Sequence, residues 1–301
     1  MLRNRALPQT IQIYLPQGDP AGIRMAEITT RTVRVFEVPR PLLRDFREMR
    51  ESKQVGVYFL FGSSPSGRPS CYIGQSGNIG DRLKQHSDKK DFWDHALVAV
   101  SLTNAWTNTH TGYMEWQAIR RATEAGRYEL HNANDASNPH TPAPLESDCR
   151  EYLETISVLL TTLGYPILEP VREIRLAGPS DGGNDAAEML LFREGGTEAR
   201  ARPTTEGLLV LAGSAGKAVA RPSLPASLLR RRLDLVEQGV VDIRGDDYVF
   251  VKDQLFSSPS TAGAVVLGGS INGRITWKTA KGRTFQQLED EALNDDSPES
   301  A

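Results

Sequence analysis

The stretch that decides the fold is VGVYFLF at residues 55–61, followed by CYIG at residues 71–74. Both runs are short, apolar and rich in β-branched and aromatic residues, a composition that favours strands. A polar loop at residues 62–70 separates them, so we expect the two strands to pair as a hairpin. Tyr58 and Tyr72 stand at matching points of this hairpin, and each strand therefore carries one phenol.

Regular elements are predicted on both sides of the hairpin. Strands are predicted at residues 10–15, 32–38 and 97–102, and helices at residues 39–49, 78–86, 112–125 and 153–163. The first two of these strands alternate polar and apolar residues, whereas the helices repeat apolar residues every three to four positions. The pattern predicts an α+β fold with a small central antiparallel sheet flanked by helices.

A second, smaller α+β module is predicted after the run GPSDGGN at residues 178–184. Its Asn272-Gly273 pair is typical of a hairpin turn, which would lead into a strand at residues 275–277. The residues after Leu288 are acidic and contain no basic residue, which is typical of disorder. The predicted organisation is a lead-in of strands and helix at 1–50, a central domain at 51–176, a linker at 177–187, the C-terminal module at 188–288 and a disordered tail at 289–301.

Composition sets limits on the function. The 301 residues suggest about two domains. Net charge is −3, from 35 basic and 38 acidic residues, so bulk charge gives no hint of a nucleic-acid partner. No apolar run approaches the roughly 20 residues that span a bilayer, so we expect no membrane association, and the first residues lack a secretory pattern. The two cysteines, Cys71 and Cys149, have no metal-site spacing, so we expect a cytoplasmic location.

Several polar residues fall in positions where apolar ones would be expected. Arg82 and His86 are four positions apart on one predicted helix and therefore share a face. On a later helix, Glu115 aligns with an apolar stripe, which predicts that its carboxylate points toward the core. The two phenols and an amide in a polar loop complete the set. The candidate site residues are Tyr58, Tyr72, Arg82, His86, Glu115 and Asn132.

This combination of groups suits phosphodiester hydrolysis. The pentavalent phosphate needs a positive group, and an arginine offers a forked donor. A single carboxylate can hold Mg²⁺ while water and phosphate oxygens fill its other positions. A metal also lowers the pKa of bound water, which a phenol can orient.

The ordered set resembles the GIY-YIG nuclease superfamily. The residues that carry the resemblance are Gly56-Val57-Tyr58, Tyr72-Ile73-Gly74, Arg82, His86, His95, Glu115 and Asn132. The ten-residue step from Tyr72 to Arg82 is as the family expects, and the match covers about residues 54–135. Val57 replaces the usual isoleucine, and the loop between the two motifs is longer than in minimal members.

The resemblance implies a role for each matching position. Glu115 would hold a single divalent metal, Mg²⁺ or Mn²⁺. Arg82 would stabilise transition-state charge. One of the two tyrosines would position or deprotonate the attacking water, and the sequence leaves open which. His86 would contact phosphate or assist proton transfer, and Asn132 would brace the site.

Each residue also has an ordinary structural explanation. Strand tyrosines pack well in cores, and an arginine on a helix is usually a solvated charge. Glu115 is close to the start of its predicted helix, where a carboxylate is favoured by the dipole. The two histidines suit surface positions, and Asn132 suits a turn. The prediction of a nuclease therefore depends on the ordered set and not on any single residue.

The C-terminal module contains Phe256-Ser-Ser-Pro-Ser-Thr-Ala-Gly263, then Asn272-Gly273, then Trp277 and Gly282. In these residues it resembles a module found behind GIY-YIG domains and associated with restriction enzymes and adenine methylases, often called RAMA. The resemblance covers roughly residues 190–288 and implies DNA contact. Basic side chains that would contact phosphate are Arg230, Arg231, Arg232, Arg274, Lys278, Lys281 and Arg283. Trp277 lies among them, and we predict that it belongs to the core.

The sequence thus predicts a metal-dependent endonuclease that hydrolyses DNA phosphodiester bonds, with restriction or phage defence as the setting. A single site cuts one strand, so a homodimer is one way to cut a duplex. The alternatives are a DNA-binding protein that kept the fold without activity, and an RNA-directed enzyme or protein-interaction module.

Overall fold

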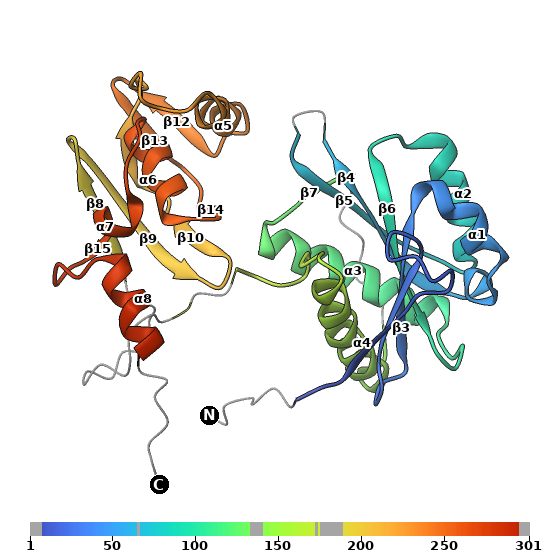
Figure 1. The fold of residues 1–301 in the computed structure, drawn as a ribbon. Helices are drawn as coiled ribbons and strands as arrows, with labels where there is room; N and C mark the ends of the chain where they lie inside the picture. Colours follow the sequence, from blue (N-terminus) through green and yellow to red (C-terminus); the bar gives the residue numbers. More distant parts are fainter. Residues whose placement is uncertain (1–7, 65–66, 133–140, 172–173, 175–188, 295–301) are drawn as a thin grey trace, which may run out of the picture. The chain divides into compact units, whose positions relative to one another are not determined.

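The computed structural model describes residues 8–64, 67–132, 141–171, 174 and 189–294 (Figure 1). Contacts divide the chain into two compact units, Met1–Pro170 (unit 1) and Val171–Ala301 (unit 2), each with its own sheet and helices. The prediction of an α+β protein is confirmed. In the described ranges, every helix is too short or too polar to traverse a bilayer. The linker predicted at residues 177–187 lies outside the described residues.

Unit 1 is built on a seven-stranded sheet in the order β1-β2-β3-β6-β4-β5-β7. Neighbouring strands are antiparallel except for the parallel pair β5 and β7. The strands are β1 (Ile11–Tyr14), β2 (Arg24–Ile28), β3 (Val33–Pro39), β4 (Gly56–Ser63), β5 (Pro69–Ser76), β6 (Trp93–Ser101) and β7 (Glu129–Leu130).

Helices cover both faces of this sheet (Figure 1). One face packs on α1 (Leu43–Glu48) and α2 (Ile79–Lys89), with the 3-10 turns η1 (Arg40–Leu42) and η2 (Arg50–Lys53) nearby. The other face packs on α3 (Asn108–Ala125) and α4 (Ala143–Thr162). Alternation along β4 sends Tyr58 and Leu60 to the first face and Val57 and Phe59 to the second.

The sheet is larger than the small one predicted, because the segment treated as a lead-in belongs to it. β3 pairs with β6 from Val33 opposite Ser101 to Pro39 opposite His95. β2 and β1 then extend the sheet outward from β3. Residues 11–39 therefore supply three strands of the sheet that carries the phenols.

The hairpin of β4 and β5 depends on a glycine at one close approach. Tyr58 pairs with Gly74 in the register of the two strands. A Cβ atom built on Gly74 would lie 2.3 Å from the hydroxyl oxygen of Tyr58. A larger residue at this position would therefore displace the phenol, so the glycine keeps Tyr58 where it lies.

Unit 2 has its own sheet, with β12-β13-β11-β9-β10-β14 in order and β8 joining β9 to β15. The strands are β8 (Leu190–Glu194), β9 (Thr197–Thr204), β10 (Gly207–Val210), β11 (Ala215–Lys217), β12 (Val241–Arg244), β13 (Asp247–Phe250), β14 (Gln254–Phe256) and β15 (Lys278–Thr279). The helices are α5 (Ala226–Glu237), α6 (Pro259–Leu267), α7 (Gly273–Thr276) and α8 (Phe285–Asn294). Trp277 is fully buried in the core of this unit, as predicted.

Two predictions for this unit were wrong. Asn272 begins a short helix instead of a hairpin turn, because its side chain accepts a hydrogen bond from the Arg274 backbone and caps α7. Residues 275–277 are consequently not a strand. The predicted disordered tail begins too early, since α8 continues to Asn294, with Leu288 buried on its inner side.

Arg232 on α5 holds the core of unit 2 together. Its side chain is buried, and its guanidinium donates hydrogen bonds to the carbonyl oxygens of Val265, Lys217 and Ala218. It also lies 3.8 Å from the ring centroid of Tyr248. Val265 belongs to the last turn of α6, where a cation satisfies free carbonyls and the helix dipole.

We expect Arg232→Ala to destabilise unit 2 by about 3 kcal/mol, because it leaves buried carbonyls without donors and opens a cavity. Hydrogen exchange followed by mass spectrometry on peptides from α6 would measure the loss. Arg231→Ala is the matched control, because Arg231 is the half-buried neighbour of Arg232 and has none of these bonds to the described carbonyls. Equal exchange in the two variants would contradict this assignment.

Candidate active site

The outer edge of β5 is where the predicted site residues meet the sheet. β7 pairs with Ser70 and Cys71, and no strand among the described residues covers the rest of β5 on this side. Beyond β7, the His131 backbone donates to the carbonyl oxygen of Cys71 at 2.8 Å. The Asn132 side chain then accepts from the Ile73 amide at 3.1 Å and donates to the Ile73 carbonyl at 2.8 Å. Asn132 thus replaces a strand partner at this edge.

Glu115 reaches the same edge from α3. Its neighbours Ala118, Ile119 and Ala122 are buried, as the stripe predicted. The half-buried carboxylate accepts a hydrogen bond from the backbone of Gln75, two residues beyond Ile73. Burial raises the pKa of Glu115, while the charge of Arg82 and the Gln75 hydrogen bond partly offset the shift.

Tyr58 lies at the centre of the site, on the face covered by α2. Its ring is buried, and its hydroxyl is 2.8 Å from Nε2 of His86. Arg82 donates from Nε to the same hydroxyl oxygen at 3.3 Å. Because a guanidinium can only donate, the proton of the phenol is directed to His86. Burial raises the pKa of Tyr58, so the phenol is held in its neutral form.

Tyr72 is the outer phenol of the pair. Its ring centroid lies 6.3 Å from that of Tyr58 and 5.2 Å from that of His86. The side chain is half-buried, in contrast to the fully buried Tyr58. Tyr72 also adds to the raised pKa of Arg82, whose largest cause is the hydrogen bond to Tyr58. The two tyrosines, which the sequence could not separate, therefore differ in exposure and in partners.

Helix α2 aligns the cationic side of the site. The helix begins at Asn78, whose side chain accepts from the Asp81 backbone. Arg82 and His86 follow on one face, and Lys90 comes at the same spacing. The Lys90 ammonium lies 4.3 Å from the ring centroid of Tyr72. Lys90 was not predicted as a site residue, although its spacing of four residues from His86 indicates the same helix face.

His86 is kept uncharged by its surroundings. Burial, together with the charges of Arg82, Lys90 and Lys89, lowers the pKa of His86 to about 4. At neutral pH, Nε2 of an uncharged imidazole can accept the proton of Tyr58. A side chain that is only 5% exposed is also poorly placed for direct contact with phosphate.

We expect stability to fall between about pH 6.5 and about pH 4 because of His86. An unfolded chain protonates this histidine near pH 6.5, whereas the folded chain does so only near the lowered pKa of about 4. Within that window the unfolded state binds the extra proton, which costs up to about 1.4 kcal/mol of stability per pH unit. Urea unfolding of the wild type and His86→Gln across the window would measure the difference. Parallel pH curves for the two proteins would contradict the assignment.

The structure brings six predicted residues together and leaves one apart. Those that converge are Tyr58, Tyr72, Arg82, His86, Glu115 and Asn132. His95 lies on the opposite face of the sheet from Tyr58, because it shares a face of β6 with Leu97 and Ala99, which pack toward α3 and α4. Its Nδ1 is 2.9 Å from Asp94, and its ring centroid is 6.3 Å from that of Tyr165. His95 therefore does not belong to this site.

Among the described residues, Glu115 is the carboxylate available to a metal at this site. Across the described ranges there is no group of three or more His, Cys, Asp or Glu side chains that could hold an ion. Glu115 has no arginine or lysine in direct ion pairing among those residues. A half-buried carboxylate of this kind fits a hard cation that takes most of its ligands from water and substrate.

The basic residues predicted to contact DNA in unit 2 are less available than the sequence suggested. Arg232 is wrong as a phosphate contact, because it is buried and donates to backbone carbonyls. Other members form ion pairs with acidic neighbours: Arg230 with Asp234 at 3.1 Å, Arg274 with Glu289 at 2.7 Å and Arg283 with Glu291 at 2.8 Å. Lys278 and Lys281 are exposed, and Arg231 is half-buried.

Comparisons with known proteins give information on unit 2 alone. A family profile described as a domain of unknown function (DUF4357) matches residues 190–289. The match covers the strands and helices from β8 into α8. No curated protein and no solved structure matches the chain. The chemistry of unit 1 must therefore be argued from its own geometry.

Proposed function

We propose that unit 1 is a metal-dependent endonuclease of the GIY-YIG type, which hydrolyses phosphodiester bonds of DNA. The observation that carries the proposal is the convergence of one guanidinium, two phenols, one neutral imidazole and one carboxylate near the β7 edge of β5. These groups come from four different elements, β4, β5, α2 and α3. A packed core alone would not require polar groups of these types at one edge.

Arg82 is the group suited to the charge of the transition state. Among the described residues it forms no ion pair with a carboxylate, and it hydrogen-bonds instead to the two phenols, Tyr58 and Tyr72, and to the Gln85 side chain at 3.1 Å. Its pKa is raised, so it keeps its charge at every working pH. A guanidinium held by a buried phenol is preorganised and loses little by turning toward a phosphate.

The two phenols divide the work. Tyr58 is buried and hydrogen-bonded to both His86 and Arg82. It therefore orients the guanidinium, and its hydroxyl links the guanidinium to the imidazole. Tyr72 is the more exposed phenol, and it positions the attacking water. Lys90, over the ring of Tyr72, adds positive charge where the phosphate would enter.

Glu115 would hold Mg²⁺ or Mn²⁺ as its single protein ligand. When bound, such a metal polarises a phosphoryl oxygen and lowers the pKa of coordinated water. The residues of this chain do the rest. Gln75 fixes the carboxylate through its backbone, and Asn132 fixes the strand edge next to it.

Incubation of supercoiled plasmid with the full chain tests this function. We expect nicked circles with Mg²⁺ or Mn²⁺ and none with a chelator. Modified plasmid, branched DNA and RNA of equal length, offered in competition, would identify the preferred substrate. Binding without metal-dependent nicking would favour a DNA-binding protein that has the fold without the activity, and preferential cutting of RNA would replace DNA as the substrate.

A further inference from the structure

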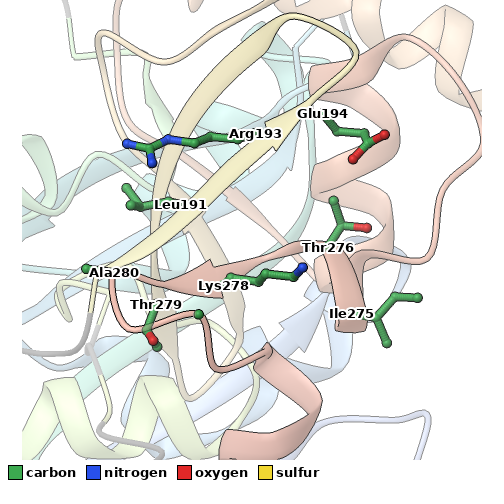
Figure 2. A pocket seen from close by; sticks show the side chains of 9 residues that line it. Leu191, Arg193, Glu194, Ile275, Thr276, Lys278, Thr279 and Ala280 are labelled. Carbon is green, nitrogen blue, oxygen red and sulfur yellow. The ribbon is translucent and has the colours of Figure 1, made fainter.

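Unit 2 contains a pocket that is separate from the site in unit 1. It opens between β8 and the segment that runs from α7 into β15 (Figure 2), and its volume is about 430 Å³. Clefts that bind small molecules or single nucleotides usually exceed about 300 Å³. The pocket is therefore large enough for one nucleotide, although far too small for a duplex.

The walls of the pocket include exposed aliphatic surface. Leu191 on β8 and Ile275 on α7 both line it. Ile275 is 49% exposed, which is high for a large apolar side chain on a short helix. Flat apolar surface next to a cavity gives an aromatic ring a place to pack, and a nucleobase presents such a ring.

Two cations stand at the pocket. Lys278 pairs with Leu191 across β15 and β8, is exposed, and forms no ion pair with any described residue. Among the described residues, Arg193 forms an ion pair with Glu198 at 3.5 Å, and this pair is weak because both side chains are 68% exposed. The nearby Arg274 and Arg283, by contrast, are tied to α8. Lys278 is thus a cation in the lining of the pocket that is available to an anionic ligand.

A carboxylate makes the pocket selective. Glu194 lines it, and Figure 2 shows Glu194, Thr276 and Lys278 on one side, with the guanidinium of Arg193 pointing away from them. An ionised carboxylate only accepts hydrogen bonds, so it repels phosphate and favours an amino group. Cytosine and adenine carry such an amino group, whereas thymine carries an oxygen at the equivalent position.

We propose that this pocket binds one unstacked nucleotide of a DNA strand, with a preference for an amino-bearing base. The base packs on Ile275, its amino group donates to Glu194, and the phosphate lies at Lys278. The choice of DNA rests on the function proposed for unit 1. Because a base inside a duplex stays stacked, the pocket directs the protein to DNA with unpaired nucleotides.

Fluorescence anisotropy with the full chain tests the proposal. The protein carries Glu115→Gln, so that it binds without cutting, and the probes are labelled oligo-dC and oligo-dT of equal length. We expect oligo-dC to bind more tightly, and Lys278→Glu to weaken its binding about tenfold. Lys252→Glu is the matched control, because it makes the same charge change at an exposed position outside the pocket.

Glu194→Gln tests the selectivity. An amide can donate to thymine O4 as well as accept, so we expect oligo-dC and oligo-dT to bind equally to this variant. Equal losses for Lys278→Glu and Lys252→Glu, or no preference for oligo-dC in the parent protein, would overturn the proposal. Its failure is distinguishable from failure of the nuclease, since plasmid nicking by the wild type depends on unit 1. Pocket-dependent binding without nicking would reject the nuclease alone.

Discussion

Glu115→Gln is expected to abolish metal-dependent cleavage while DNA binding and thermal stability stay unchanged. The amide has the shape of the carboxylate and can still accept the backbone hydrogen bond of Gln75, but it lacks the charge that holds a hard cation. Loss of several kcal/mol of metal stabilisation corresponds to a rate lower by more than about a thousandfold. Initial nicking rates at saturating Mn²⁺ would measure the effect.

A matched control lies on the same helix. Glu124→Gln removes an exposed carboxylate of α3 that pairs with Arg120 at 3.5 Å. We expect this variant to cut at the wild-type rate. Wild-type activity in Glu115→Gln, or an equal loss in both variants, would show that Glu115 is not the metal ligand.

Arg82→Ala is expected to slow cleavage by about 10²–10³-fold and to change DNA affinity far less. The guanidinium contacts Tyr58 and carries its charge next to Glu115, so its effect belongs to the transition state more than to the bound substrate. Single-turnover rates and equilibrium affinities, measured on the same oligonucleotide duplex, would separate the two contributions.

Lys84→Ala serves as the control for this substitution. Lys84 lies on the same helix, is exposed, and pairs with Asp88 at 2.6 Å. Its loss is expected to leave the rate unchanged. If Arg82→Ala lowers rate and affinity by the same factor, Arg82 is an ordinary phosphate contact, and the transition-state role would be rejected.

The central hairpin and its helices could be predicted from the sequence because they depend on local patterns. Apolar strand runs fixed β4 and β5, and helical spacing placed Arg82 and His86 on one face. The extent of the sheet could not be predicted in this way. β3 joins β6 across about sixty residues of chain, and no local pattern specifies that partner.

Burial of charged residues was the other limit. The run Arg230-Arg-Arg232 looked like one basic surface, yet Arg232 is inside the core. Its position four residues after Leu228 and three before Leu235 was a helical signal for burial. At the site, the spacing from Tyr72 to Arg82 indicated proximity, but only the folded structure shows that Tyr58 is hydrogen-bonded to both Arg82 and His86.

The central claim is that the carboxylate of Glu115 supports metal-dependent cutting of phosphodiester bonds. Its most direct test is one plasmid incubated with the wild type and with Glu115→Gln, first with a chelator and then after Mn²⁺ is restored. The account predicts that nicked circles appear only for the wild type and only after the metal is added. Nicking by both proteins, nicking in the chelator, or intact plasmid in every tube would contradict it.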